Sequence, residues 1–351
     1  MTSSPHGETQ ISSAVGQIVK GFSRQRTIAE RHELSLILEI GGLSVRLDMH
    51  GAELAQHLCG VFRHLTTRDM AAPAALHIQI AALTGSAIEL LEKLSVPPPG
   101  LIASEPTGPL MVELHKRLAI AVDRAQHRVT AIAGDLNDMP STHFSRPFAH
   151  MFGWLGAQRR RFLTHGAAIG HDGRGILLAG SGGQGKSTTA LACALAGWQF
   201  VGDDFVMLER NDSGTLIAHS LYATGRLHPA QAARFPALIE HWDSRLSPED
   251  EKLTLFPHEG AVALTRSLKI DAIALPVVGR LDEMGVGPLS RARALRALIT
   301  DSIQVYPWLT RERAEFYAET VERLPCYTIR VGPDIAALPD LIERVLERAK
   351  T

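Results

Sequence analysis

Apolar and polar residues alternate from Leu34 to Ile40, which is the pattern of a strand with one buried face. Gly41-Gly42 is typical of a hairpin turn, and the alternation resumes from Leu43 to Leu47. The pattern further predicts a helix over 52–65, a loop over 97–100, and strands over 77–80, 117–122 and 128–132. We expect the first half to be a small α+β unit with antiparallel strands, which is either a recognition or assembly domain or a structural cap.

A helical pattern from Ser141 to Arg161 marks the expected domain boundary, and its apolar face is made of Phe148, Met151, Phe152 and Leu155. Strand and helix patterns then alternate, as expected for an α/β fold. The predicted strands are 165–170, 175–179, 198–204, 269–275 and 326–331, with a turn or short strand over 285–289; the predicted helices are 187–196, 290–300, 310–324 and 336–349. The expected organisation is a disordered tail over 1–20, an N-terminal α+β domain over 21–140 and an α/β domain over 141–351.

The loop after the strand over 175–179 fits the phosphate-binding pattern G-x-x-x-x-G-K-[ST] without a mismatch. Its residues are Gly180, Ser181, Gly182, Gly183, Gln184, Gly185, Lys186, Ser187 and Thr188. Glycines let backbone N–H groups face phosphate oxygens, and the N-terminus of the following helix favours negative charge. The pattern predicts a bound nucleotide triphosphate, with Lys186 on the outer phosphates and Ser187 on Mg²⁺. The alternative is a glycine-rich turn without a ligand, and the strand before and helix after argue against it.

Asp172-Gly173 predicts a two-residue hairpin turn between the strands over 165–170 and 175–179. His171 then pairs with Arg174, and His165 falls opposite Gly180. His165 is therefore expected beside the phosphate loop, either as a member of the site or as a structural residue at a strand start.

Asp203-Asp204 end the next strand, and Asp203 follows Lys186 by 17 positions. The carboxyl ends of strands in an α/β sheet face the ligand crevice, so we expect the two acids beside the Mg²⁺ and the terminal phosphate. One carboxylate of such a pair accepts a proton from an incoming hydroxyl, while the other holds the metal directly or through water. An ordinary acidic turn is the alternative.

Composition narrows the class of protein. Hydrophobic residues make up 45% and charged residues 21%, which is typical of a globular chain, and 36 Lys and Arg against 37 Asp and Glu argue against a nucleic-acid partner. The three cysteines have neither disulfide nor metal-binding spacing, which favours a cytoplasmic setting. The N-terminus lacks the apolar segment of a signal peptide, and no window reaches the ~18 apolar residues of a membrane span, so no membrane partner is expected.

Single polar residues of the first half are predicted to be solvated; they are His115, His127, Asp135 and Asp138.

In order and spacing, His165-Gly166, the hairpin, Gly180 to Ser187 and Asp203-Asp204 resemble the catalytic domain of bacterial HPr kinase/phosphorylase. The resemblance implies a P-loop kinase domain with a mixed sheet and a hairpin before the loop, with ATP and Mg²⁺ as cofactors. It implies transfer of phosphate to a serine of a protein or peptide partner, and assembly into a homo-oligomer. Asp203 would be the base, His165 its neighbour, Lys186 the phosphate contact and Ser187 a metal ligand. The residues alone suggest Asp204 as a metal-side carboxylate.

The chain departs from that family at 219–227, where a metal-binding glutamate is expected and no acid is present. The layout is more similar to HPr-kinase-related proteins, among them kinases of the C-terminal serine of lasso-peptide precursors. Arg226 is expected either at a phosphate or acidic substrate or on the surface. In the helix over 290–300, Arg291, Arg293 and Arg296 either reach the transferring phosphoryl group or form a solvated face.

The first hypothesis is therefore an ATP-dependent serine kinase of a peptide or protein. A nucleotide-hydrolysing regulatory switch is the second, but a guanine-reading N-K-x-D motif is missing. A kinase of a small-molecule hydroxyl is the third.

Overall fold

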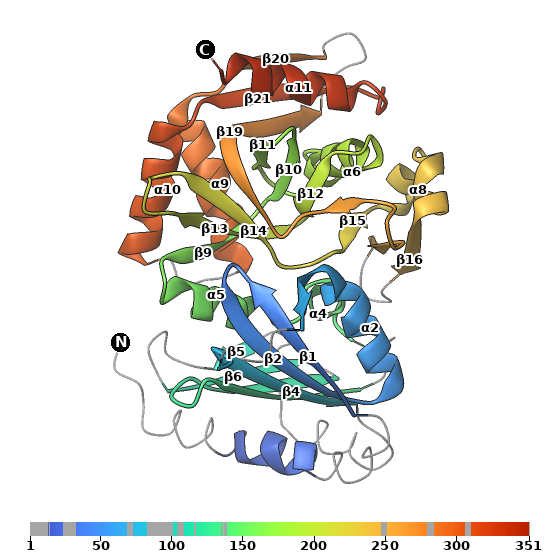
Figure 1. The fold of residues 1–351 in the computed structure, drawn as a ribbon, viewed down its shortest axis with the longest axis vertical. Coiled ribbons are helices and arrows are strands. Elements are labelled where there is room, and N and C mark those ends of the chain that lie inside the picture. The colour runs from blue at the N-terminus through green and yellow to red at the C-terminus, as the bar shows by residue number, and fades with distance from the viewer. Residues whose placement is uncertain are drawn as a thin grey trace. The chain divides into compact units, whose positions relative to one another are not determined.

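The structure is a computed structural model that describes residues 13, 15–23, 33–68, 73–82, 101–103, 109–115, 117–134, 136, 139–246, 251–278, 284–305 and 310–350. The chain divides into two compact units, Met1–Pro147 with Ser247–Asp250 and Phe148–Leu246 with Glu251–Thr351 (Figure 1). Among the described residues, no helix combines the length and apolarity needed to cross a bilayer. The predicted loop at 97–100, as well as Asp135 and Asp138, falls outside the described residues.

The first unit is built on a mixed sheet with the strand order β3-β1-β2-β4-β8-β7-β6-β5. Its strands are β1 (Glu33–Ile40), β2 (Leu43–His50), β3 (Thr66–Thr67), β4 (Leu76–Ala82), β5 (Leu101–Ala103), β6 (Leu110–His115), β7 (Leu118–Asp123) and β8 (Arg128–Ala133). The predicted hairpin turn is confirmed, because Gly41 and Gly42 have φ of 55° and 71° and Ile40 pairs with Leu43. The expectation of antiparallel strands is wrong for β4, which runs parallel to β2 and β8. The connection through α2 (Ala52–Phe62) supplies the crossover that parallel strands need.

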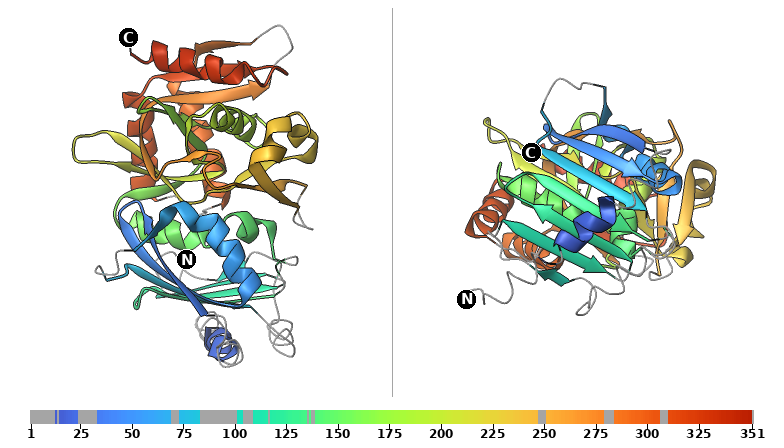
Figure 2. Two further views of the ribbon diagram at one scale, coloured as in Figure 1. Left: turned by 45° about the vertical axis from the view of Figure 1, so that its right-hand side comes forward. Right: turned by 90° about the horizontal axis from the view of Figure 1, so that it is seen from below.

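Helices cover both sides of this sheet, with α2, extended by η1 (Arg63–Leu65), on one side and a helix over 15–23 on the other (Figure 2). The helix over 15–23 shows that the expected disordered tail over 1–20 is wrong for residues 15–20, whereas residues 1–12 and 14 lie outside the described ones. Ile18 and Phe22 lie four positions apart, so they share a helix face, and they are buried against Val112 and Ile132 of the sheet. This apolar stripe is what orders the segment.

The single helix expected over 141–161 is two helices, α4 (Ser141–Ser145) and α5 (Ala149–Ala157). Pro147 has no backbone N–H to continue a helix, and Phe148 is left-handed with φ of 62°. The four apolar residues of the predicted face are nevertheless all buried; they are Phe148, Met151, Phe152 and Leu155. The break falls where the two compact units meet in the sequence.

The second unit contains a large mixed sheet in the order β18-β12-β10-β11-β19-β14-β13-β9, with β21 also paired to β19 and β20 to β21. Its strands are β9 (Arg161–His165), β10 (Ala167–His171), β11 (Arg174–Leu178), β12 (Gln199–Gly202), β13 (Phe205–Arg210), β14 (Leu216–Ser220), β18 (Ala263–Leu264), β19 (Ser267–Val278), β20 (Gly285–Pro288) and β21 (Cys326–Val331). A smaller sheet consists of β15 (Gly225–Leu227), β17 (Leu253–Pro257) and β16 (Trp242–Leu246).

Helices sandwich the large sheet (Figure 1). Helices α6 (Lys186–Leu195) and α11 (Leu338–Arg348) pack on one face, and α9 (Arg291–Val305) and α10 (Arg311–Arg323) pack on the other. The shorter helices are α7 (Pro229–Ala232) and α8 (Pro236–His241). In β11, Ile176 and Leu178 are buried in the apolar core under α6 and α11, whereas Leu177 is buried in the core under α9 and α10. The reason is that successive side chains of a strand point to opposite faces of the sheet. A strand covered on both faces reads as an unbroken apolar run, and this is the run that the sequence shows before the phosphate loop.

Replacing Gly175 in β11 by alanine is expected to destabilise the second unit by about 1–3 kcal/mol. A Cβ at this position would overlap the carbonyl oxygen of Lys269 and approach Leu268 Cδ2 to 2.9 Å, so the paired strand must shift. All four tryptophans of the chain lie in the second unit, so urea denaturation followed by tryptophan fluorescence reports on it alone. Gly287→Ala is the control, because a Cβ there meets no atom within 4 Å, and an equal loss of stability in both variants would contradict the packing argument.

Candidate active site

The loop between β11 and α6 has an open backbone cradle. Gly180, Gly183 and Gly185 have φ of 128°, 80° and 98°, a region that residues with a side chain disfavour. Gln184 Oε1 accepts the N–H of Ser181 at 2.8 Å and closes the loop. A Cβ added to Gly182 or Gly183 would meet no atom within 4 Å, so this side of the loop is accessible. Backbone in this shape, at the start of a helix, suits an anionic ligand.

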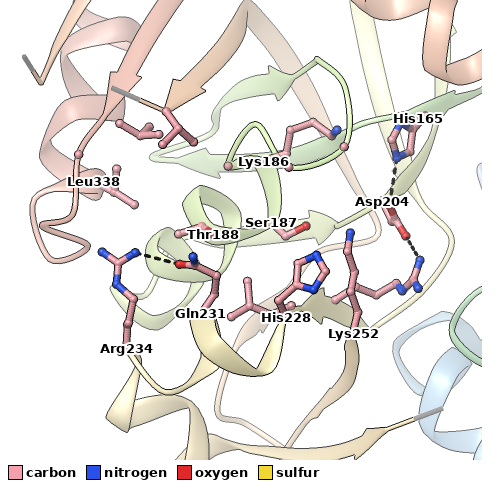
Figure 3. Close-up of a pocket in the computed structure, with 18 residues that line it drawn as sticks. His165, Lys186, Ser187, Thr188, Asp204, His228, Gln231, Arg234, Lys252 and Leu338 are labelled. Carbon is pink, nitrogen blue, oxygen red and sulfur yellow. Dashed lines mark hydrogen bonds and ion pairs between the residues drawn. The ribbon is translucent and has the colours of Figure 1, made fainter. Parts of the chain in front are cut away.

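Lys186 and Ser187 begin α6 and point in different directions (Figure 3). The buried Lys186 Nζ donates to the carbonyl oxygen of Gly180 and, at 3.2 Å, to that of Ser181. Ser187 Oγ donates to Asp203 Oδ1 at 3.0 Å. The first residue of the acid pair is thus in direct contact with the phosphate-loop serine.

Sheet topology explains why loop and acids meet. Strands β11 and β12 run in the same direction, because each is antiparallel to β10 between them. Their carboxyl ends therefore lie at one edge of the sheet, with the loop after β11 and the acid pair after β12.

Asp203 is buried, with a relative exposure of 2%. Its Oδ1 also accepts the N–H of Asp204 at 2.9 Å, and its Oδ2 accepts the N–H of Arg226 at 2.9 Å. Burial raises the pKa of Asp203 above the usual 3.8, and the adjacent charge of Asp204 raises it further, against the opposing effect of these hydrogen bonds and of Lys186. The carboxyl group is therefore held inside the protein, facing Ser187.

Asp204 faces the opposite way, because its backbone is left-handed with φ of 71°. Its Oδ1 contacts His165 Nε2 at 3.0 Å, and its Oδ2 accepts a hydrogen bond from Arg226 Nη1 at 3.0 Å. Asp204 lines a cavity together with Lys186 and Ser187 (Figure 3). The two adjacent acids thus differ in position, with Asp203 in the protein interior and Asp204 on the cavity wall.

The hairpin register predicted from Asp172-Gly173 is confirmed from His171–Arg174 to Ala167–Leu178. His165 itself belongs to the preceding strand β9, where it pairs with Phe205 of β13, next to Asp204. The strand predicted over 165–170 is divided at Gly166, where a Cβ would lie 2.8 Å from the carbonyl oxygen of Leu178. The N–H of His165 donates to Ser302 Oγ at 3.0 Å, so α9 also holds the histidine in place.

The cavity has a volume of about 180 Å³ and a strongly basic lining. Among the lining residues that the structure describes, four are Lys or Arg and the one carboxylate is Asp204. Sequence patterns did not predict His228, Gln231, Arg234 and Lys252, which also line it (Figure 3). Of the two arginine expectations, Arg226 is in the site, whereas Arg291, Arg293 and Arg296 are exposed on α9 and are not among the lining residues.

Comparison with known proteins finds curated relatives that share one description. No family model matches the chain. The HPr kinase/phosphorylase of Geobacillus thermodenitrificans is 24% identical over 238 residues, which cover 59% of this chain and 72% of that protein. The HPr kinase/phosphorylase of Geobacillus kaustophilus is 22% identical over 312 residues, which cover 74% of this chain and 95% of that protein. The chain is similar to HPr kinase/phosphorylases.

A solved structure, the HPr(Ser) kinase/phosphatase from Coxiella burnetii, aligns over 54% of this chain and 95% of its own, with 15% identity and a TM-score of 0.30. The two curated relatives align over 72% and 95% of their own length, and both carry the name of the family that the sequence resembles.

Proposed function

We propose that this protein is an ATP- and Mg²⁺-dependent kinase that transfers the γ-phosphoryl group to a serine hydroxyl of a peptide or protein. The second unit would be a P-loop catalytic domain of the HPr kinase type. The observation that carries the proposal is the position of Asp204, which lines the same cavity as Lys186 and Ser187 and contacts His165 and Arg226. A nucleotide-binding loop does not need such a carboxylate, whereas transfer to a hydroxyl does.

The chemistry of the cavity lining supports a nucleotide triphosphate as the ligand. The open side of Gly182 and Gly183 leaves room for phosphate oxygens against backbone N–H groups. Lys186, Arg226, Arg234 and Lys252 supply positive charge for a polyanion. Apolar side chains of Val331 and Leu338 also line the cavity and suit the nucleoside part of ATP.

Ser187 and Asp203 are the residues that fit Mg²⁺, which prefers oxygen ligands. Their oxygens lie 3.0 Å apart, beside the phosphate loop. When bound, Mg²⁺ would neutralise charge on the phosphate oxygens. The absence of an acid at 219–227 leaves Asp203 as the carboxylate that best suits this role.

We further propose that the expected roles of the two acids are exchanged, with Asp204 as the base. Asp203 faces Ser187 in the interior and accepts hydrogen bonds at both oxygens, which suits a metal-side ligand better than contact with an incoming hydroxyl. Asp204 is on the cavity wall, where a hydroxyl can approach it. His165 and Arg226 orient its two oxygens, and Arg226 balances its charge. Asp204 would accept the hydroxyl proton while the serine oxygen attacks the γ-phosphorus, the bond from that phosphorus to the β–γ bridging oxygen breaks, and ADP leaves.

Incubation with ATP and Mg²⁺, followed by tandem mass spectrometry of candidate acceptors, tests this function. The acceptors are HPr and a peptide that ends in serine, as in lasso-peptide precursors, each matched with a version in which that serine is alanine. We expect phosphate on serine in one acceptor and none on its alanine version. ATP hydrolysis that no acceptor accelerates would instead favour a nucleotide-driven switch, and phosphate on a small-molecule hydroxyl would favour the third hypothesis.

Binding of Mg²⁺-nucleotide is expected to weaken as the pH falls, over a range that begins higher than for an ordinary aspartate. The raised pKa of Asp203 means that protons begin to compete with the ion above the usual value of 3.8. Below that raised pKa, affinity falls by up to about tenfold per pH unit. Calorimetric titration with Mg²⁺ and a non-hydrolysable ATP analogue over a pH series measures the effect. Asp203→Asn is expected to bind more weakly and without this pH dependence, and an unchanged dependence would contradict the assignment.

A further inference from the structure

Three potential metal ligands converge in the first unit, separately from the phosphate loop. Glu113 Oε1 lies 2.9 Å from His115 Nε2 and 2.7 Å from His143 Nε2, and the two nitrogens lie 2.9 Å apart. All three residues are buried, with relative exposures of 1%, 8% and 5%. The proposed phosphotransfer site uses none of them.

Two elements bring these side chains together. Glu113 and His115 are two positions apart in β6, so they point to the same face of the sheet. His143 comes from α4, which is held by α2: His57 Nε2 donates to the carbonyl oxygen of Phe144 at 2.8 Å, and the two rings pack at 4.2 Å. The position of His143 is thus set by packing around it.

Hydrogen bonding alone does not explain a triangle of these three atoms. A ring N–H lies in the imidazole plane and points to one acceptor, and a nitrogen that carries a proton there accepts none. If both histidines donate to Glu113 Oε1, two N–H groups converge on one oxygen with their nitrogens only 2.9 Å apart. If one histidine instead donates to the other, that N–H is not available to Glu113, and the accepting nitrogen has no proton to donate to it. A cation between the three atoms accepts lone pairs from all of them.

We propose that Glu113, His115 and His143 bind a single Zn²⁺. Two imidazole nitrogens and one carboxylate oxygen form a known zinc ligand set, at about 2.0–2.2 Å from the ion. Tetrahedral ligands at that distance lie about 3.3 Å apart, so the observed spacings need only open by a few tenths of an ångström.

The ion would act as a cross-link within the first unit. It would join the end of β6 to α4, between residues 28 and 30 positions apart in the sequence. Free energy of zinc binding becomes folding free energy where the ligands converge only in the folded state. The segment that contains α4 would therefore be ordered more firmly when zinc is bound.

The test uses the full chain without a histidine tag, incubated with Zn²⁺ in excess Mg²⁺ and passed through gel filtration. Metal analysis by mass spectrometry is expected to give one zinc per chain. His115→Ala and His143→Ala are each expected to weaken zinc binding by more than about 100-fold, since even outer partners of metal ligands contribute 10- to 100-fold. The matched control is His77→Ala, a partly exposed histidine of the same unit that pairs with Asp48 and is expected to retain the zinc.

Hydrogen exchange on the unsubstituted chain keeps the test independent of variant folding. Zinc is expected to slow exchange in the segment over 139–146 and to leave α6 unchanged. Failure of the unsubstituted chain to retain zinc would overturn the proposal. Equal loss of zinc in His77→Ala and His143→Ala would also overturn it, because the ion would then be bound without this triangle.

Discussion

Asp204→Asn is expected to lower the rate of phosphate transfer by about 10²- to 10⁴-fold, the usual contribution of a positioned general base. The amide is nearly the same size as the carboxylate, and its oxygen still accepts the hydrogen bond from Arg226 while its NH2 group faces His165 Nε2, but it does not take a proton from serine. Nucleotide affinity is expected to stay within about threefold of that of the unsubstituted chain, because the phosphate loop is untouched. Single-turnover transfer from labelled ATP measures the rate, and a fluorescent ATP analogue measures binding.

Two companion variants make this result specific. Asp203→Asn is expected to weaken Mg²⁺-nucleotide binding, since Asp203 contacts Ser187. Asp243→Asn is expected to change neither rate nor binding, because that carboxylate is 79% exposed on β16. Full transfer activity in Asp204→Asn would remove it as the base. Loss of transfer in Asp203→Asn with Mg²⁺-nucleotide binding intact would return that role to Asp203.

Lys186→Ala is expected to lower transfer by at least about 10²- to 10³-fold, the cost of removing one preorganised donor from the developing charge. The amine is buried at the loop, bonded to the carbonyl oxygens of Gly180 and Ser181, so it is held beside the backbone that would surround the phosphates. Nucleotide binding is expected to weaken as well, because the charge contributes in the ground state. The same rate and binding measurements apply.

Lys269→Ala provides the matched control for Lys186→Ala. Lys269 lies in the same unit on β19, is 55% exposed and pairs with Asp271. We expect wild-type transfer from it. Comparable losses in the two lysine variants would show that the effect arises from destabilisation of the unit rather than from the phosphate loop.

Local signals in the sequence were sufficient for the elements around the phosphate loop and for those after residue 267, but they predicted none of the elements between Phe205 and Leu264. The Asp172-Gly173 turn predicted the hairpin register, and the phosphate-loop pattern predicted the strand and helix on either side of it. The strand pairing of His165 could not be predicted from such local signals. Its partner strand β13 lies about forty residues further along the chain, and a pairing over that distance leaves no local pattern.

Side-chain direction was the second kind of information that the sequence lacked. The spacing of Asp203-Asp204 located the pair at the loop, but their separation into interior and cavity wall depends on the left-handed backbone at Asp204. Arg234 and Lys252 reach the cavity from segments without a motif. His143 meets Glu113 across 30 positions, a spacing that no metal-binding pattern includes.

Strand β11 is synthesised well before β19, the strand with which it pairs in parallel. Gly175 contacts Asp271 across 96 positions, and β19 covers the edge of β11 that leads into the phosphate loop. At about 5–20 residues per second, a ribosome adds that length in roughly 5–20 s. Until then the apolar edge of Ile176 to Leu178 has no partner on that side, and the loop has no fixed support. The loop over 180–188 is therefore expected to reach its final position late, after a period in which chaperones can bind this edge of β11.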